Sequence, residues 1–146
     1  MTKNIFITGG TSGIGKSLIY KFAENKCNIF FTYNTNLNEA QSISKNLKKH
    51  NILHNYAKMD LSRPETINNA FKKFSKQFRR LNIFINNASI KMQRKEFLKL
   101  KNIEISKNIK GLLIGNIISL KKALELSLKK SSSNQSIIIN ISSYAS

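Results

Sequence analysis

The sequence predicts a doubly wound α/β fold, in which helices cover both faces of a parallel sheet. Short apolar runs of strand length alternate with amphipathic segments of helical spacing along the whole chain. The runs are apolar throughout, as in strands that are buried on both faces. We therefore expect five strands in the order 3-2-1-4-5, within a single domain that spans residues 1–146.

The first half of the chain supplies three strands and two helices. An apolar run at residues 5–7 predicts the first strand, and residues 17–23 follow it with apolar side chains at helical spacing. Residues 28–33 are the second strand. After a turn-rich stretch, residues 39–49 form an amphipathic helix, and residues 55–61 are a weaker third strand.

The second half continues the same alternation. Ser62 is expected to cap a helix that has the only proline near its first turn and that ends near Phe78. A fourth strand at residues 81–87, a long helical stretch at 102–130 and a fifth strand at 136–141 complete the pattern. In such a sheet ligands bind beyond the carboxyl ends of the strands, so the residues that follow each strand are functional candidates.

A glycine-rich loop, T-G-G-T-S-G-I-G at residues 8–15, joins the first strand to the first helix. Free backbone N–H groups and the positive end of the helix dipole point at such a loop, which makes it a phosphate cradle. Two motifs overlap here. Residues 10–17 satisfy the P-loop pattern G-x-x-x-x-G-K-[ST], and residues 8–15 satisfy T-G-x-x-x-G-x-G.

The second motif and three strand ends resemble the short-chain dehydrogenase/reductase family. That family has T-G-x-x-x-G-x-G as its nucleotide loop and an acidic residue against the adenine ring, where this chain has D-L at residues 60–61. The N-N-A-S of residues 86–89 corresponds to its usual N-N-A-G, and the N-I-S-S of residues 140–143 to its active-site serine. The resemblance spans essentially the whole chain and implies a Rossmann-like, NAD(P)-dependent oxidoreductase that reduces a carbonyl or oxidises an alcohol.

The resemblance also implies which residues form the site. Ser143 is the candidate that hydrogen-bonds the reacting oxygen, and Asn108, in an N-x-x-G pattern, is the candidate that holds a proton-relay water. Asn116 fits the spacing to Ser143 better but lacks the following glycine. The expected cofactor-binding residues are Gly9, Thr11, Ser12, Gly13, Ile14, Gly15, Asn34, Asp60, Leu61, Asn87 and Ala88.

The residue after the second strand bears on the choice of cofactor. An acidic residue there would bind the ribose 2′-OH of NAD and repel a 2′-phosphate, whereas this chain has the neutral Asn34. The sequence thus favours NADP, although Ser12, Asn34 and Thr35 supply no basic side chain and NAD stays open. We expect no metal, because the single Cys27 excludes a multi-cysteine zinc site.

The largest departure from the family concerns its tyrosine and lysine. Its Y-x-x-x-K motif falls beyond the active-site serine, and the chain ends at Ser146; Tyr144 has no lysine four residues on. A general acid/base contributes typically ~10²–10⁴-fold to the rate. We therefore expect the N-terminal part of a reductase, a truncated form that binds the cofactor with little or no turnover.

The chain is strongly basic, with 25 Lys and Arg against 7 Asp and Glu and a net charge of +18. Such a charge can indicate a nucleic-acid partner, but the lysines are spread over several helices, and abundant Lys, Asn and Ile fit a biased base composition. No apolar run approaches the ~20 residues of a membrane span, and the chain starts almost directly on a strand. We expect a cytoplasmic protein with a dinucleotide and a small carbonyl or alcohol as partners, and a homo-oligomer stays open.

Two other functions remain as alternatives: a P-loop nucleotide hydrolase that uses residues 10–17, and a non-catalytic basic binding module. A P-loop protein usually needs a second apolar strand that ends in Asp to help hold Mg²⁺. Here the strand that leads to Asp60 is interrupted by Lys58. The alternative interpretation of Lys16 and Ser17 is the exposed first turn of a helix.

Overall fold

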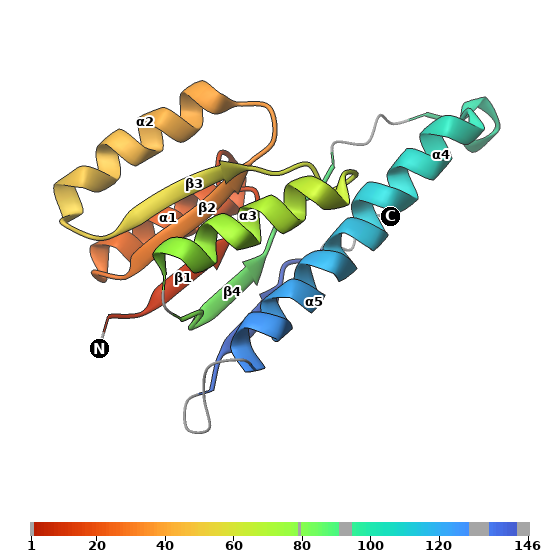
Figure 1. The fold of residues 1–146 in the computed structure, drawn as a ribbon. Helices are drawn as coiled ribbons and strands as arrows, with labels where there is room; N and C mark the ends of the chain where they lie inside the picture. The colour runs from red at the N-terminus through yellow and green to blue at the C-terminus, as the bar shows by residue number, and fades with distance from the viewer. Residues whose placement is uncertain (1, 79, 91–94, 129–134, 143–146) are drawn as a thin grey trace.

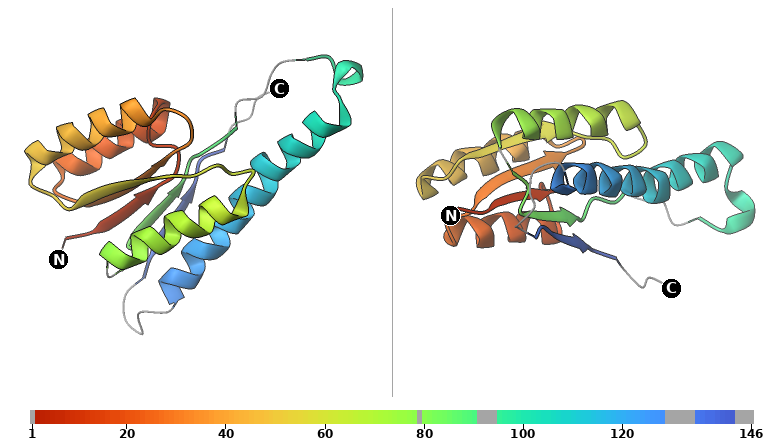
Figure 2. Two further views of the ribbon diagram at one scale, coloured as in Figure 1. Left: turned by 45° about the horizontal axis from the view of Figure 1, so that its top comes forward. Right: turned by 60° about the horizontal axis from the view of Figure 1, so that its bottom comes forward.

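A computed structural model describes residues 2–78, 80–90, 95–128 and 135–142 and shows a parallel sheet between two layers of helices (Figures 1 and 2). All four strand pairings are parallel, and the order β3-β2-β1-β4-β5 confirms the expected 3-2-1-4-5. The strands are β1 (Asn4–Ile7), β2 (Asn28–Tyr33), β3 (His54–Lys58), β4 (Ile83–Asn86) and β5 (Ile137–Asn140).

Each face of the sheet is covered by its own pair of helices. On one face, α1 (Gly13–Glu24) and α2 (Leu37–Leu47) pack on the isoleucines of β1. On the other, α3 (Pro64–Gln77) and α5 (Gly115–Leu128) form a second core with Phe6. Figure 2 shows the sheet between these two layers. The remaining helical segments are the short turns Lys48–His50 and Phe97–Lys99, α4 (Asn102–Ile109) and a π-helical turn at Lys110–Ile114.

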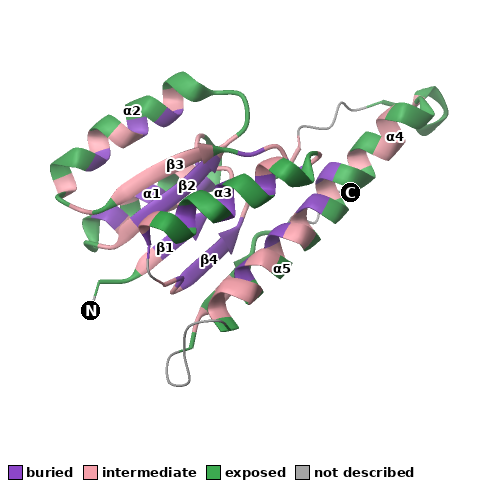
Figure 3. Ribbon diagram, viewed as in Figure 1, coloured by how far each residue is buried: buried purple, intermediate pink, exposed green. Residues whose placement is uncertain are grey.

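Phenylalanines fix β1 in the middle of the second core. The ring of Phe6 lies 4.6 Å from that of Phe71, 5.3 Å from that of Phe74 and 5.5 Å from that of Phe84, measured between centroids. Such aromatic pairs contribute ~0.5–1.5 kcal/mol beyond the area that they bury. Figure 3 shows the consequence along the sheet, where β4 is buried throughout and β3 is half-buried.

Asparagine side chains join the amino ends of the inner strands. Asn28 donates its side-chain amide to Oδ1 of Asn4 (2.9 Å), and the backbone N–H of Asn4 donates to Oδ1 of Asn82 just before β4 (2.9 Å). Oδ1 of Asn28 in turn accepts from the backbone N–H of Leu53, just before β3 (3.0 Å). These bonds align the amino ends of four strands, at the end of the sheet opposite the glycine loop.

The expected cap at Ser62 is wrong. Arg63 occupies the N-cap position of α3, and its side chain makes no capping bond. Ser62 is held elsewhere, because both its hydroxyl and its backbone N–H donate to Oδ1 of Asp60, at 2.7 and 2.9 Å. Pro64 is the first residue of the helix, a position that proline favours, so the N-cap falls on Arg63 and Ser62 lies one residue outside the helix.

Two further boundaries differ from expectation. Helix α1 begins at Gly13, inside the glycine loop, earlier than the apolar spacing at residues 17–23 indicates. Glycines carry no apolar side chain, so the periodicity does not extend to the first turn. The stretch expected to be one helix over 102–130 is divided into α4, the π-helical turn and α5; Leu128 is the last residue of α5, and Lys130 lies outside the described residues.

Close packing at Gly115 decides where α5 lies. A Cβ on this glycine would overlap the carbonyl oxygen of Leu61, just beyond β3, and would lie 2.9 Å from the Cβ of Leu61. Only a residue without a side chain permits this approach. Helix α5 therefore passes directly beside the carboxyl end of the sheet.

The outer strand β5 leaves apolar surface exposed. Ile137 is 52% exposed and Ile139 39% exposed, while Ile138 packs against the core of α3 and α5. Among the described residues, β5 pairs only with β4.

Candidate functional site

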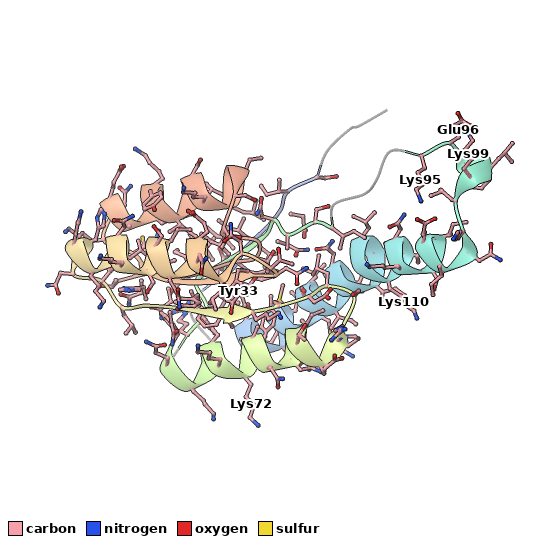
Figure 4. All side chains as sticks on the ribbon, turned by 90° about the horizontal axis from the view of Figure 1, so that it is seen from above. Tyr33, Lys72, Lys95, Glu96, Lys99 and Lys110 are labelled. Carbon is pink, nitrogen blue, oxygen red and sulfur yellow. The ribbon has the colours of Figure 1, made fainter. Side chains whose placement is uncertain are left out.

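A cavity of about 920 Å³ lies at the carboxyl ends of the inner strands, where the fold class places ligands. Its walls come from the glycine loop, the ends of β2 and β3, the segment after β4, and α4. In Figure 4, which views the molecule from above, Tyr33 lies beside β3 and Lys95 lies on the segment that leads to α4. The expected site residues that line the cavity are Gly9, Thr11, Ser12, Asn34, Asp60, Leu61, Ala88 and Asn108.

The glycine loop presents a helix N-terminus to solvent. Ser12 is the N-cap of α1 but forms no side-chain capping bond, so the first-turn N–H groups keep their capacity to donate. Gly13 has φ +50°, which an L side chain rarely adopts, and nothing lies within 4 Å of the place a Cβ would occupy. The loop thus combines free donors with open space, which fits an anionic phosphate group.

The rest of the loop is packed against β4. A Cβ on Gly15 would overlap the carbonyl oxygen of Gly9 and come within 2.6 Å of Nδ2 of Asn87. The side-chain amide of Asn87 donates to the backbone carbonyls of Thr8 (2.9 Å) and Gly9 (3.2 Å). Asn87 is therefore committed to holding the loop, and Gly13, Ile14, Gly15 and Asn87 are absent from the cavity lining.

The buried hydroxyl of Thr8 completes this link. Oγ1 accepts from the backbone N–H groups of Asn87 (2.9 Å) and Ala88 (2.8 Å) and donates weakly to the carbonyl of Ile85 (3.4 Å). On the next strand pair, Nδ2 of Asn86 donates to Oδ1 of Asn140 (3.1 Å). These bonds join β1, β4 and β5 at their carboxyl ends.

Asp60 is an ionised carboxylate on the cavity wall. Partial burial raises the pKa of its carboxyl, but hydrogen bonds from the hydroxyl and N–H of Ser62, with the nearby cations Arg63 and Lys107, outweigh burial and hold the pKa below its ordinary value. The guanidinium contact is loose, at 3.9 Å from Nε of Arg63 to Oδ2. The backbone N–H of Asp60 donates to the hydroxyl of Thr66 (2.9 Å), which fixes the segment after β3.

Lys16, the lysine of the alternative P-loop motif, is turned toward α2. Its Nζ lies 2.9 Å from Oε1 of Glu39, and this bond raises the pKa of the lysine. A P-loop lysine must instead reach the phosphates. Lys16 is not among the residues that line the cavity, and this geometry disfavours the P-loop alternative.

Of the two candidate asparagines, one lines the cavity and the other does not. Asn108, on α4, is half-buried and lines the cavity. Asn116, on α5, donates its side-chain amide to the carbonyl of Leu112 (2.8 Å) within its own helix and does not line the cavity. Ser143 lies outside the described residues.

Several lining residues escaped the sequence reasoning. Among them are Lys58, Arg63, Lys95, Glu104 and Lys107. Lys95, Glu104 and Lys107 belong to α4 and the segment before it, and no local pattern encodes their approach to the strand ends. Lys58 could have been found, because it closes the third strand on the side where ligands bind.

The sequence profile of one family, described as short chain dehydrogenase, matches residues 3–146. The chain belongs to this family. The L-rhamnose 1-dehydrogenase (NADP(+)) of Thermoplasma acidophilum is 30% identical over 88 residues, which are 60% of this chain and 35% of that protein. The 3-oxoacyl-[acyl-carrier-protein] reductase FabG of Staphylococcus aureus is 26% identical over 143 residues, 98% of this chain and 56% of that protein.

Solved structures of other proteins share the Rossmann-like fold of this chain. A Burkholderia cenocepacia short chain dehydrogenase in complex with NADP superposes with a TM-score of 0.80 at 22% identity, covering 86% of this chain and 51% of that one. A blue fluorescent protein from a metagenomic library, in complex with NADPH, gives a TM-score of 0.87 at 21% identity and covers 97% and 56%. The chain thus spans about half the length of these proteins or less.

Two other kinds of site find no support in the described part of the chain. Within it, His, Cys, Asp and Glu side chains nowhere gather in a group of three or more that could hold a metal. None of its helices combines the length and the apolar character needed to span a bilayer.

Proposed function

We propose that this chain forms the dinucleotide site of an NAD(P)-dependent oxidoreductase that reduces a carbonyl or oxidises an alcohol. The observation that carries the proposal is the cavity at the strand ends, continuous with an uncapped helix N-terminus in a member of the short-chain dehydrogenase family. The solved complexes of related folds with NADP and NADPH give further support.

Each part of the cofactor has candidate partners along the cavity. The pyrophosphate would lie against Ser12, which lines the cavity, and would reach the first-turn N–H groups of α1 in the open space beside Gly13. Asp60 and Leu61 would lie against the adenine, and Asn34 would lie against the adenosine ribose. Asn108 and Ser143 are proposed to face the reacting end, where the bound nicotinamide would supply or accept the hydride.

We propose NADP as the preferred dinucleotide, because the neutral Asn34 does not repel a 2′-phosphate. Turnover by the chain alone should be low. Its 146 residues contain no Y-x-x-x-K, so Asn108 and Ser143 would act without the general acid/base that protonates the carbonyl oxygen.

A parallel binding experiment separates this proposal from its alternatives. NADPH, ATP with Mg²⁺, and duplex DNA are each titrated into the chain by isothermal calorimetry. Gly13→Val should abolish NADPH binding, because its branched Cβ would fill the open space beside the helix N-terminus and strain a backbone at φ +50°. Lys16→Ala, which removes only the ion pair to Glu39, should bind NADPH as the parent does.

Other results would identify another function. Mg²⁺-dependent ATP binding that Lys16→Ala destroys would establish the P-loop alternative. DNA binding without any NADPH binding would establish a basic binding module. A thermal melt of each variant shows whether a lost affinity comes from the site or from unfolding.

A further inference from the structure

We infer that Lys58 is the residue that selects NADP over NAD, by placing its ammonium against the 2′-phosphate of the adenosine ribose. The inference rests on the dinucleotide site proposed above and adds the positive charge that the glycine loop and the end of β2 lack. Ser12, Asn34 and Thr35, which all line the cavity, are uncharged.

The register of the sheet puts Lys58 beside the ribose end of the cavity. Lys58 is the last residue of β3 and is paired with Tyr33, the last residue of β2. Paired residues of parallel strands project from the same face of the sheet. Asn34, the residue expected at the ribose, directly follows Tyr33, and all three residues line the cavity.

Alternation along β3 sets the direction of the lysine. Tyr56, two residues earlier, projects into the core beneath α1 and α2. Lys58 projects from the same face, but at the strand end, where it is exposed. A lysine suits this position, because Lys58 is exposed to solvent and lines the cavity.

Each of the other basic residues that line the cavity lies near a carboxylate. Arg63 lies beside Asp60, with its Nε 3.9 Å from Oδ2, and Nζ of Lys95 lies 2.6 Å from Oε1 of Glu104. Lys107 lies on α4, and its positive charge helps to lower the pKa of the Asp60 carboxyl. The structure gives the side-chain ammonium of Lys58 no hydrogen bond or ion pair to any described residue, so this charge is available to a ligand.

The chemistry accounts for a preference between two closely similar ligands. NADP differs from NAD only by a phosphate on the ribose 2′-oxygen, and a lysine ammonium binds phosphate as a mobile point charge. Because Lys58 is exposed, solvent weakens the attraction, and we expect roughly a two- to fivefold effect at low ionic strength that shrinks as salt is added.

The test compares Lys58→Met with the parent chain by titrating NADPH and NADH at low and high ionic strength. Lys58→Met should lose roughly two- to fivefold in affinity for NADPH at low salt and keep its affinity for NADH. Lys58→Arg should retain the preference. Lys72→Met, on the outer face of α3 and pointing away from the sheet in Figure 4, removes the same charge and should leave the preference unchanged.

The outcomes separate this inference from the proposed function. If the parent chain binds neither dinucleotide, the proposed function itself fails. If the parent binds NADPH and Lys58→Met keeps the parent's ratio of affinities, or weakens both ligands equally, only the role of Lys58 is overturned. Lys107→Met is the second control. If it changes the ratio of NADPH to NADH affinity and Lys58→Met does not, the 2′-phosphate lies beside α4.

Discussion

The hydroxyl of Thr8 is fully buried, and it accepts two backbone N–H groups that the sheet itself does not pair. Thr8→Val keeps the shape of the side chain but leaves the N–H groups of Asn87 and Ala88 without this acceptor. Leaving a buried donor unsatisfied costs about 1–3 kcal/mol, so we expect the free energy of unfolding to fall by about 2 kcal/mol. Urea denaturation measures the loss.

Thr8→Ser is the matched control for this prediction. It retains the hydroxyl and removes one methyl group, so it should lose less stability than Thr8→Val. The reverse order would mean that packing, and not the two hydrogen bonds, makes Thr8 important.

A second prediction at this scale concerns Asn34. Asn34→Asp adds a negative charge at the cavity wall, where the 2′-phosphate of NADP is proposed to lie. The variant should lose affinity for NADPH and gain relative preference for NADH, measured by titrating both dinucleotides. A parent that already prefers NADH would show that the end of β2 does not select NADP.

Site residues in contiguous motifs could be predicted from sequence, and those set by packing could not. The glycine loop, Asp60 and Ala88 were identified from short patterns, and the structure places them around the cavity or in its lining. The predicted capping role of Ser62 is wrong because α3 begins at Pro64, which puts the N-cap at Arg63. Glu104 joins the wall only because α4 approaches from far along the chain, which no local pattern records.

At the scale of elements, helix α5 depends on one glycine for its position. Gly115→Ala would raise intrinsic helix propensity by about 1 kcal/mol, yet its Cβ would overlap the backbone carbonyl of Leu61. Because backbone cannot rotate aside as a side chain can, we expect a net loss of stability of about 1–3 kcal/mol. Thermal and urea unfolding measure this loss.

Ile114→Ala, one position earlier, is the control for Gly115→Ala. Ile114 is 43% exposed and should be replaced at small cost. A Gly115→Ala chain that is as stable as the parent would show that α5 can move away from the end of β3.

The order and faces of the elements were predictable because burial on both sides makes each inner strand an apolar run. Phe6 and its neighbours Ile5 and Ile7 illustrate this, since they serve opposite cores and are all fully buried. Boundaries were less predictable. The π-helical turn at Lys110–Ile114 divides a continuous helical pattern and leaves no periodic signal.

At the scale of the whole molecule, exposed apolar surface favours self-association and the net positive charge opposes it. Ile137 and Ile139 on β5 are exposed, as are Leu113 in the π-helical turn and Ile117 on α5. An exposed apolar edge strand is a template for pairing with another chain. We therefore expect the 146-residue chain to self-associate in spite of its net charge of +18, as measured by size-exclusion chromatography with light scattering.

The double variant Ile137→Lys, Ile139→Lys should shift the chain toward monomer, because charge on an edge strand disfavours pairing. Leu98→Lys, at a position that is 95% exposed, adds charge far from β5 and should have a smaller effect. A parent chain that elutes as a monodisperse monomer would contradict the prediction.

The asparagine bonds at the amino ends of the strands have a consequence for hydrogen exchange. Strand ends usually fray, so their amides exchange with solvent through small local openings. Here the N–H groups of Asn4 and Leu53 donate to side chains of neighbouring strands, and Thr8 protects the N–H groups of Asn87 and Ala88 at the opposite edge. With both ends of the inner strands held by cross-strand bonds, deuterium should enter β1 and its neighbours only when the sheet opens as a single unit.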